Sequence, residues 1–101
     1  MINLGELFEQ YTEEEFLKFA LIKNKLHRRG DIHAFLLLDK LSPGNKDIVK
    51  SAELSAMYLN IDTTALAKVI TEGQVIELIR CGVSFDGNDL FIDKEISSYE
   101  A

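Results

Sequence analysis

The chain holds few of the residues that build disulfides, metal centres or membrane spans. Cys81 is the single cysteine among 101 residues, so it can form no internal disulfide and no cysteine-based metal site. His27 and His33 lie six positions apart with no cysteine nearby, which favours solvated or capping histidines over a metal site. No apolar run is long enough to cross a bilayer, and no signal-peptide pattern follows Met1. We therefore expect a cytoplasmic protein without a membrane partner.

The common catalytic motifs are also missing. The sequence contains no glycine-rich phosphate loop, no nucleophile elbow and no zinc-ligand spacing. Its paired carboxylates lie on stretches whose pattern indicates solvated faces. We therefore expect a protein that is not an enzyme and that holds neither a cofactor nor a metal.

Composition favours one globular domain, residues 1–101, with an uneven distribution of charge. The hydrophobic fraction of 47% and the charged fraction of 28% are ordinary for such a domain. Residues 1–50 carry eight basic and eight acidic side chains, whereas residues 51–101 carry three basic and nine acidic ones. The whole net charge of −6 therefore lies in the second half of the chain. An acidic surface there suits a basic partner better than it suits nucleic acid.

Two helices are predicted before residue 30. Residues 3–10 fit a short amphipathic helix, and residues 13–27 fit a longer one. Thr12 is the expected N-cap of the longer helix, Glu15 would close a capping box, and the first-turn glutamates would favour the helix dipole. Residues 11–19 also resemble the opening helix of the small acidic immunity proteins that neutralise nuclease colicins. The histidine- and tyrosine-containing inhibitor motif of that family does not follow downstream.

A basic cluster ends this predicted N-terminal extension, residues 1–30. Arg28 and Arg29 stand just before Gly30, which we expect to stop the helix. Cations in a last helical turn complement the negative end of the helix dipole, and they can also form a phosphate-binding patch. The commoner explanation is the first, but the two arginines remain candidates for binding nucleic acid.

The middle of the chain predicts a central helix, a turn and a short strand. Asp31 is the expected cap of a helix over residues 32–41, which is apolar nearly all round. A turn is predicted at residues 42–45. Residues 47–50 fit a short strand that would pair with a hairpin later in the chain.

The stretch 51–93 predicts two helices and a hairpin. The first helix would run from Ser51 through Asn60, and the second, capped by Asp62, from residue 63 to residue 72. Strands at 83–85 and 90–92 flank the turn-forming residues 86–89, which suits a hairpin.

Residues 73–81 admit two interpretations. In the first, Gly73 ends the helix and residues 75–81 alternate as a strand. In the second, the helix continues through Gly73 to Ile79. A glycine within a helix costs about 1 kcal/mol relative to alanine, and the β-branched run is a poor helix former. We therefore prefer the strand.

The order of these elements, with the segments SAELSAMYLNIDTTALAKVITEG and VIELIRCGVSFDGNDLFID, resembles the winged helix-turn-helix superfamily of bacterial regulators and plasmid replication proteins. The resemblance covers about residues 31–96. It implies an α+β, mainly helical fold with an additional N-terminal helix and a C-terminal β-hairpin wing. It also implies that the helix at 63–72 enters the DNA major groove.

Two functions of different class follow. In the first, the protein is a small DNA-associated regulator of transcription or replication. Its nucleic-acid-binding candidates are Thr63, Thr64, Lys68, Thr71, Arg28 and Arg29. With so few cations such binding would be weak for a monomer, because DNA affinity depends largely on neutralising phosphates. A homodimer would strengthen it, and Phe8, Phe19 or Phe91 would mark a dimer surface if exposed.

In the second, the protein is an acidic interaction module, such as an inhibitor, adaptor or immunity-type protein, that binds a basic protein instead of DNA. The charge asymmetry favours this function. Its partner-binding candidates are Glu72, Glu77, Asp86 and Asp89. The usual use of the winged helix places the DNA-associated regulator first.

Overall fold

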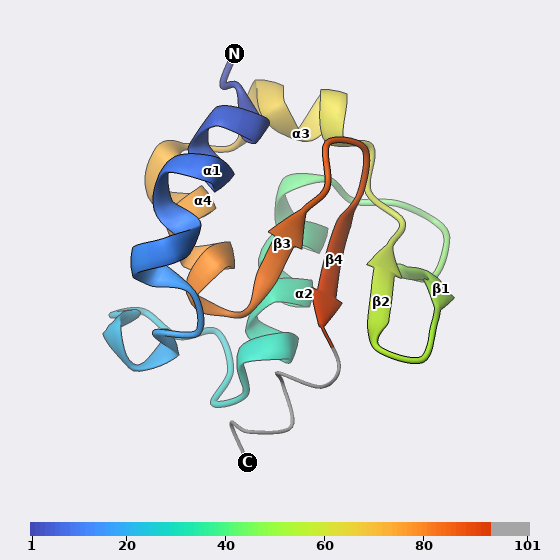
Figure 1. Ribbon diagram of the computed structural model, residues 1–101. Helices are drawn as coiled ribbons and strands as arrows, with labels where there is room; N and C mark the ends of the chain where they lie inside the picture. The colour runs from blue at the N-terminus through green and yellow to red at the C-terminus, as the bar shows by residue number, and fades with distance from the viewer. Residues whose placement is uncertain (94–101) are drawn as a thin grey trace.

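The computed structural model describes residues 1–93 of the chain and shows an α+β fold (Figure 1). Its helices are α1 (Leu4–Glu15), the short 3₁₀ helix η1 (Phe19–Leu21), α2 (Gly30–Leu41), α3 (Thr63–Val69) and α4 (Glu72–Arg80). Its strands are β1 (Val49–Ala52), β2 (Ala56–Leu59), β3 (Val83–Phe85) and β4 (Leu90–Asp93). The α+β class expected from the sequence is confirmed. Residues 94–96, the end of the predicted winged helix, lie outside the described residues.

The four strands form one antiparallel sheet in the order β1-β2-β4-β3. The hairpin predicted at 83–85 and 90–92 is confirmed, with Val83 opposite Ile92 and Phe85 opposite Leu90. Gly87 in its turn has a φ of +101°, a conformation that glycine adopts without steric cost. The sheet joins the middle of the chain to its end, because β2 pairs with β4.

Helix α4 lies at the centre of the packing. Val75, Leu78 and Ile79 follow helical spacing and are fully buried. The helix contacts α1, α2, η1 and β3, so it has neighbours on several sides. Figure 1 shows α1 running alongside α4, with α2 behind the sheet. The hydrophobic core therefore forms around the helix that directly precedes the β3–β4 hairpin.

The prediction of a long helix over residues 13–27 is wrong. The helix predicted at 3–10 instead continues to Glu15, with Asn3 as its N-cap and Phe16 as its C-cap. Thr12 is therefore an interior residue whose carbonyl accepts the Phe16 N–H, so no capping box begins there. The resemblance to the immunity proteins depended on a helix that begins after Thr12. In the structure no helix begins there. Leu4 and Phe8 are buried in the core, and Tyr11 and Glu15, beyond the expected end of the helix, contact α4.

The prediction of a helix over residues 51–60 is also wrong. Those residues form β1, a turn and β2, and β1 pairs with β2 rather than with the later hairpin as expected for the strand at 47–50. Leu54 lies in the turn between the two strands and is 99% exposed. Met57 and Tyr58 pair with β4, which gives hydrogen-bond partners to the backbone of β2. This pairing outweighs the helical spacing of the apolar residues in the segment.

The strand predicted at 75–81 is wrong, and so is the end of the preceding helix at Gly73. Helix α3 begins after its predicted cap Asp62, whose side chain accepts the N–H groups of Thr64 and Ala65, but it ends at Val69. A second helix, α4, then begins after Thr71 with Gly73 in its first turn. The alternative of one continuous helix is not observed either, because Ile70 adopts an extended conformation.

The helix predicted at 32–41 is confirmed with a small correction. It begins at Gly30, and Asp31 lies in its first turn instead of at its cap. The expected dimer marker Phe8 is buried, whereas Phe19 and Phe91 are half-buried. None of the three is therefore an exposed aromatic surface.

Candidate interaction surface

Two polar contacts between side chains fix α1 along α4. The Tyr11 hydroxyl donates a hydrogen bond to Glu72, and this contact raises the pKa of the tyrosine above its usual value. One turn further along α1, the Arg80 Nε donates to Glu15 Oε1 at 3.1 Å, and both side chains are largely shielded from solvent. Because these residues lie at the two ends of α4, the contacts cover the length of that helix with α1.

The third polar anchor of α4 is His33, which is completely buried in α2. Its Nδ1 accepts the Leu26 N–H at 2.9 Å, so that nitrogen carries no proton. Its Nε2 therefore donates to Glu77 Oε2, also at 2.9 Å. The expectation of a solvated or capping histidine is wrong for His33, which links α2 to α4. His27 accepts the Arg29 N–H in a local turn.

The nucleic-acid-binding candidates on α3 lie beside the tip of the hairpin. Thr64 and Lys68 are exposed, whereas Thr63 is half-buried and its hydroxyl donates to the Asn88 carbonyl at 3.3 Å. Thr71 is exposed and caps α4 through the N–H of Gln74. Lys68 is thus the one cation among the four threonine and lysine candidates.

Arg28 and Arg29 do not join the candidates on α3. Both are exposed, and Arg29 pairs with Asp31 at 3.4 Å. Figure 1 places the segment before α2 at the opposite end of the molecule from α3. With Lys18, Lys23 and Lys25 they form a basic segment at residues 18–29. Within residues 1–93, these arginines therefore form no continuous basic surface with α3.

The predicted partner-binding carboxylates are mostly engaged within the chain. Glu72 and Glu77 hold Tyr11 and His33, as described above. Asp89 pairs with Lys50 at 2.6 Å and so ties the hairpin turn to β1. Asp86 accepts the N–H groups of Asp89 and Asn88 in its own turn, and these hydrogen bonds lower the pKa of its carboxyl group. These four side chains stabilise the fold, and they do not form one free acidic face.

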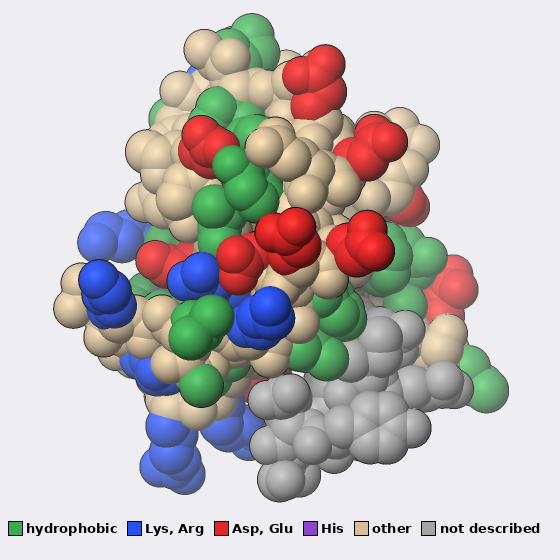
Figure 2. Space-filling view, turned by 60° about the vertical axis from the view of Figure 1, so that its left-hand side comes forward, with side chains coloured by type: hydrophobic (Ala, Val, Ile, Leu, Met, Phe, Trp, Pro, Cys, Tyr) green, Lys and Arg blue, Asp and Glu red, His purple; other side chains and the backbone are tan. Residues whose placement is uncertain are grey.

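Four exposed acidic side chains lie together on α1. Glu6, Glu9, Glu13 and Glu14 are exposed, and none forms an ion pair among residues 1–93. Figure 2 shows acidic side chains across the middle of this face and basic ones gathered below them. Sequence reasoning assigned Glu13 and Glu14 to the first turn of a helix, where anions are favourable. They lie in the last turn of α1, where the dipole disfavours them.

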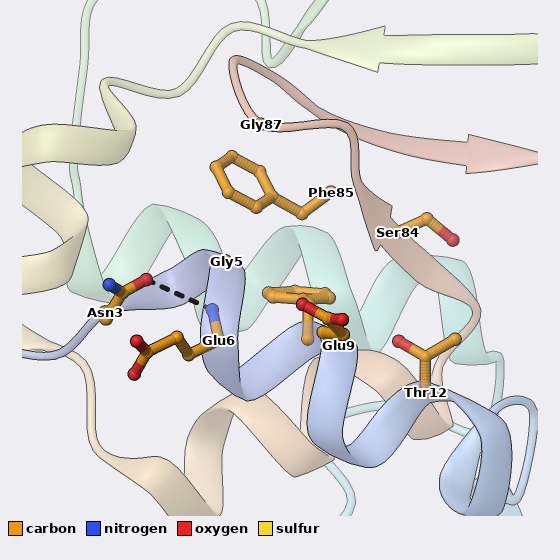
Figure 3. A pocket seen from close by; sticks show the side chains of 9 residues that line it. Asn3, Gly5, Glu6, Glu9, Thr12, Ser84, Phe85 and Gly87 are labelled. Atoms are coloured by element: carbon orange, nitrogen blue, oxygen red, sulfur yellow. Dashed lines mark hydrogen bonds between the residues drawn. The ribbon is translucent and has the colours of Figure 1, made fainter.

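A groove runs between α1 and the β3–β4 hairpin. It has a volume of about 570 Å³ and is open to solvent. Figure 3 shows α1 and the hairpin as its two walls, with Glu9 and Thr12 on α1 directed toward β3. Phe85 extends from the hairpin and packs against Phe8 with ring centroids 5.8 Å apart. A neighbouring hollow of about 580 Å³ shares Gly5 and Phe85 with the groove and extends to α3.

The remaining features concern the single cysteine, metal binding and membrane spans in residues 1–93. Burial raises the pKa of the Cys81 thiol to about 12, which makes it a poor nucleophile. Among residues 1–93, no group of three or more histidine, cysteine or acidic side chains is arranged to hold a metal ion. No helix in the same range is both long enough and apolar enough to span a membrane.

Comparison with protein-family models finds no match to this chain, and searches of curated proteins and of solved structures find no similar protein.

Proposed function

We propose that the protein is a non-enzymatic regulatory protein with a winged-helix unit over about residues 31–96, and that it binds a basic protein partner rather than DNA. The observation that carries the proposal is the position of α1. This helix packs along α4 and carries four exposed glutamates that form no ion pair among the described residues, so it shields a helix that would read DNA and adds an acidic surface.

The winged-helix part of the proposal rests on element order. Helix α2, strands β1 and β2, the α3–α4 pair and the β3–β4 hairpin follow one another; the strand expected at 47–50 falls on β1, and β2 replaces part of the helix expected at 51–60. The helix pair is not the one expected from the sequence, since the second helix of the pair is α4 and not residues 63–72. The element that would enter the major groove is therefore α4.

Helix α4 is poorly suited to read DNA. Its charged side chains Glu72, Glu77 and Arg80 are each held by a residue of α1 or α2. It offers no free cation to neutralise phosphates, and α1 occupies one of its sides. The hairpin turn adds two more carboxylates at Asp86 and Asp89. Entry of α4 into the major groove would require displacement of α1. The two polar contacts that join these helices, Tyr11 with Glu72 and Glu15 with Arg80, would then be lost.

A basic protein partner fits the same surface. The four free glutamates of α1 lie on a preformed helix, so a cationic partner would pay little ordering cost on the side of this protein. Exposed charges of one sign also steer an oppositely charged partner and raise its association rate. The energetic cost of carboxylates at the end of α1 is consistent with their retention for binding, because local rules are most often broken at functional sites.

The DNA-associated regulator of transcription or replication remains the competing proposal. The observation that favours it is the exposure of Thr64 and Lys68 on α3, next to the hairpin tip. This surface holds one cation and predicts weak, salt-sensitive binding for a monomer. A homodimer would double that charge.

Titrations with DNA and with a cationic peptide distinguish the two proposals. A labelled random-sequence duplex and a labelled oligolysine are each titrated at low salt with protein to about 50 μM, the range of non-specific DNA binding. We expect oligolysine to bind, the duplex not to bind, and the Glu13→Gln/Glu14→Gln variant to weaken oligolysine binding. Duplex binding that falls with salt and with Lys68→Gln would establish the DNA-associated function and refute ours.

A further inference from the structure

We propose that an amphipathic helix of the basic partner docks over the groove and the neighbouring hollow, with apolar side chains over Phe85 and cations beside Glu9. This inference rests on the proposed function and deepens it by naming the binding site and the form of the bound segment. Three observations carry it: an uncharged hollow, a glycine that joins the hollow to the groove, and carboxylates on one wall.

The neighbouring hollow is an apolar recess. Residues 1–5, α3 and the hairpin surround it, and none of the residues that line it has a charged side chain. Its apolar lining includes Met1, which is 90% exposed, and Phe85, which is half-buried. Its volume of about 580 Å³ lies within the range of binding pockets. Covering such surface with apolar side chains of a partner removes it from water and is favourable.

Gly5 lines both the groove and the hollow and so joins them. Figure 3 shows it in the first turn of α1, next to the ring of Phe85. A Cβ here would lie 3.5 Å from Asn3 Oδ1 and 3.9 Å from Phe85 Cε2, which are ordinary contacts, and the φ of Gly5 is not positive. Glycine is also a poorer helix former than alanine. Neither backbone nor packing therefore requires glycine at this position, whereas a larger side chain would lie over Phe85.

The bound segment must satisfy its own backbone hydrogen bonds. Helix α1 packs on β3, with Phe8 against Phe85, so no further strand can pair with β3 at this place. Buried backbone groups need hydrogen-bond partners. A helix bonds its own N–H and C=O groups and inserts only side chains, at positions i, i+3, i+4 and i+7. A helix therefore suits this surface better than an extended segment.

Charge complementarity identifies the bound helix as basic. Glu6 and Glu9 line the groove, and both are exposed. No lysine or arginine lines either the groove or the hollow. A helix with one apolar side bordered by lysine or arginine would cover Phe85 and place its cations beside Glu9. An acidic helix would instead bring like charges together at this wall.

The test uses a peptide of about fifteen leucine and lysine residues with the leucines at helical spacing. A second peptide has the same composition, rearranged so that no helical side is apolar. Both are titrated against the full chain at physiological salt, below the concentration at which either self-associates, with oligolysine of equal charge as the third probe. We expect the helical peptide to bind with a dissociation constant below about 100 μM and at least about tenfold tighter than the rearranged one. Its leucine methyl groups should give nuclear Overhauser contacts with the ring of Phe85.

Gly5→Leu closes the junction of groove and hollow without a change of charge. It should weaken binding of the helical peptide at least about tenfold and leave oligolysine binding unchanged. Because leucine is the better helix former, the variant should not melt at a lower temperature than the natural chain. Gly73→Leu is the matched control, since Gly73 is also an exposed second residue of a helix but lines neither the groove nor the hollow. It should change peptide binding less than about twofold.

A second pair of variants tests the carboxylate wall. Glu9→Gln should weaken binding of the helical peptide by about threefold. Asp39→Asn removes an equal charge from an exposed position of α2 that lines neither the groove nor the hollow, and it should have little effect. A helical peptide with glutamate in place of lysine should not bind. Equal binding of that peptide would refute the assignment of a basic occupant.

The outcomes distinguish this inference from the proposed function. Equal affinity of the helical and rearranged peptides, or unchanged binding by Gly5→Leu, refutes the docking site, while oligolysine binding would keep the proposed function intact. A dimer that forms without peptide and is lost in Gly5→Leu would identify a second copy as the occupant and overturn the basic-partner assignment. Competition by duplex DNA would refute the proposed function itself.

Discussion

The thiol of Cys81 is the most perturbed titratable group described in the chain. Burial raises its pKa from 9.0 to about 12, with the charge of Glu77 as the second cause. The native state therefore keeps its proton across a range in which the unfolded chain loses it. By linkage, stability is full below about pH 9 and falls as the pH rises toward about 12.

We therefore predict that urea denaturation shows decreasing stability from pH 9 upward, with a shallower decrease in Cys81→Ala. A thiol reagent at neutral pH should modify the native protein only as fast as the chain opens. Rapid modification under native conditions would contradict the burial of this side chain.

Gly82 allows the chain to pass from α4 into β3. Its φ of +95° is strained for any other residue, and a Cβ at this position would lie 2.8 Å from Leu17 Cδ2. The contacted atom is the end of a flexible side chain and can shift, so most of the expected cost comes from the positive φ of Gly82. We predict that Gly82→Ala lowers the free energy of unfolding by about 2 kcal/mol in chemical denaturation. Gly44→Ala, where a Cβ would meet no atom within 4 Å, is the control and should change it little.

At the scale of elements, α1 shows a conflict between charge and helix dipole. Glu6 lies in its first turn, where a carboxylate is favourable, whereas Glu14 lies in its last, where no basic residue offsets it. We predict that Glu14→Gln stabilises the protein by about 0.3 kcal/mol and that Glu6→Gln destabilises it by a similar amount. Urea denaturation at low salt measures both. Added salt should reduce both differences, and effects of equal sign would refute the dipole explanation.

The elements that the sequence predicts correctly depend on local chemistry. Asp62 caps α3 through two backbone N–H groups, and the turn at 86–89 folds through its own Asp86 carboxylate. Both signals lie within a few residues. The capping box of Thr71 and Gln74 is equally local and was missed, although it would have identified α4 as a separate helix.

The remaining elements depend on pairing between distant segments. Residues 51–60 have helical spacing, but β2 forms because β4 offers it a partner more than thirty residues later, as in the pair Met57 and Ile92. The groove is less predictable still. It exists because Tyr11 and Glu15 fix α1 on α4, which brings Glu9 opposite β3. No pattern within α1 indicates that neighbour, so the sequence predicted acidic binding residues on the hairpin and on α4 rather than on α1.

At the scale of the whole molecule, stability should be greatest around α4. This helix contacts α1, α2, η1 and β3, and its Leu78 and Ile79 are fully buried, as is Ile92 of β4. The turn between β1 and β2 is the opposite case, since Leu54 is 99% exposed and β1 lies at a sheet edge. Opening α4 would disrupt all of its neighbours together, so its amides should exchange only through global unfolding.

We predict that native-state hydrogen exchange shows the slowest amides at Leu78, Ile79 and Ile92, with exchange free energies equal to the global value from denaturation. Amides near Leu54 should exchange fastest among the strands. Because Arg80 and Glu15 join α1 to α4, Arg80→Ala should lower protection in α1 more than in α2. Equal losses in both helices would mean that α1 does not open separately. In that case, entry of α4 into DNA would require unfolding of the whole molecule.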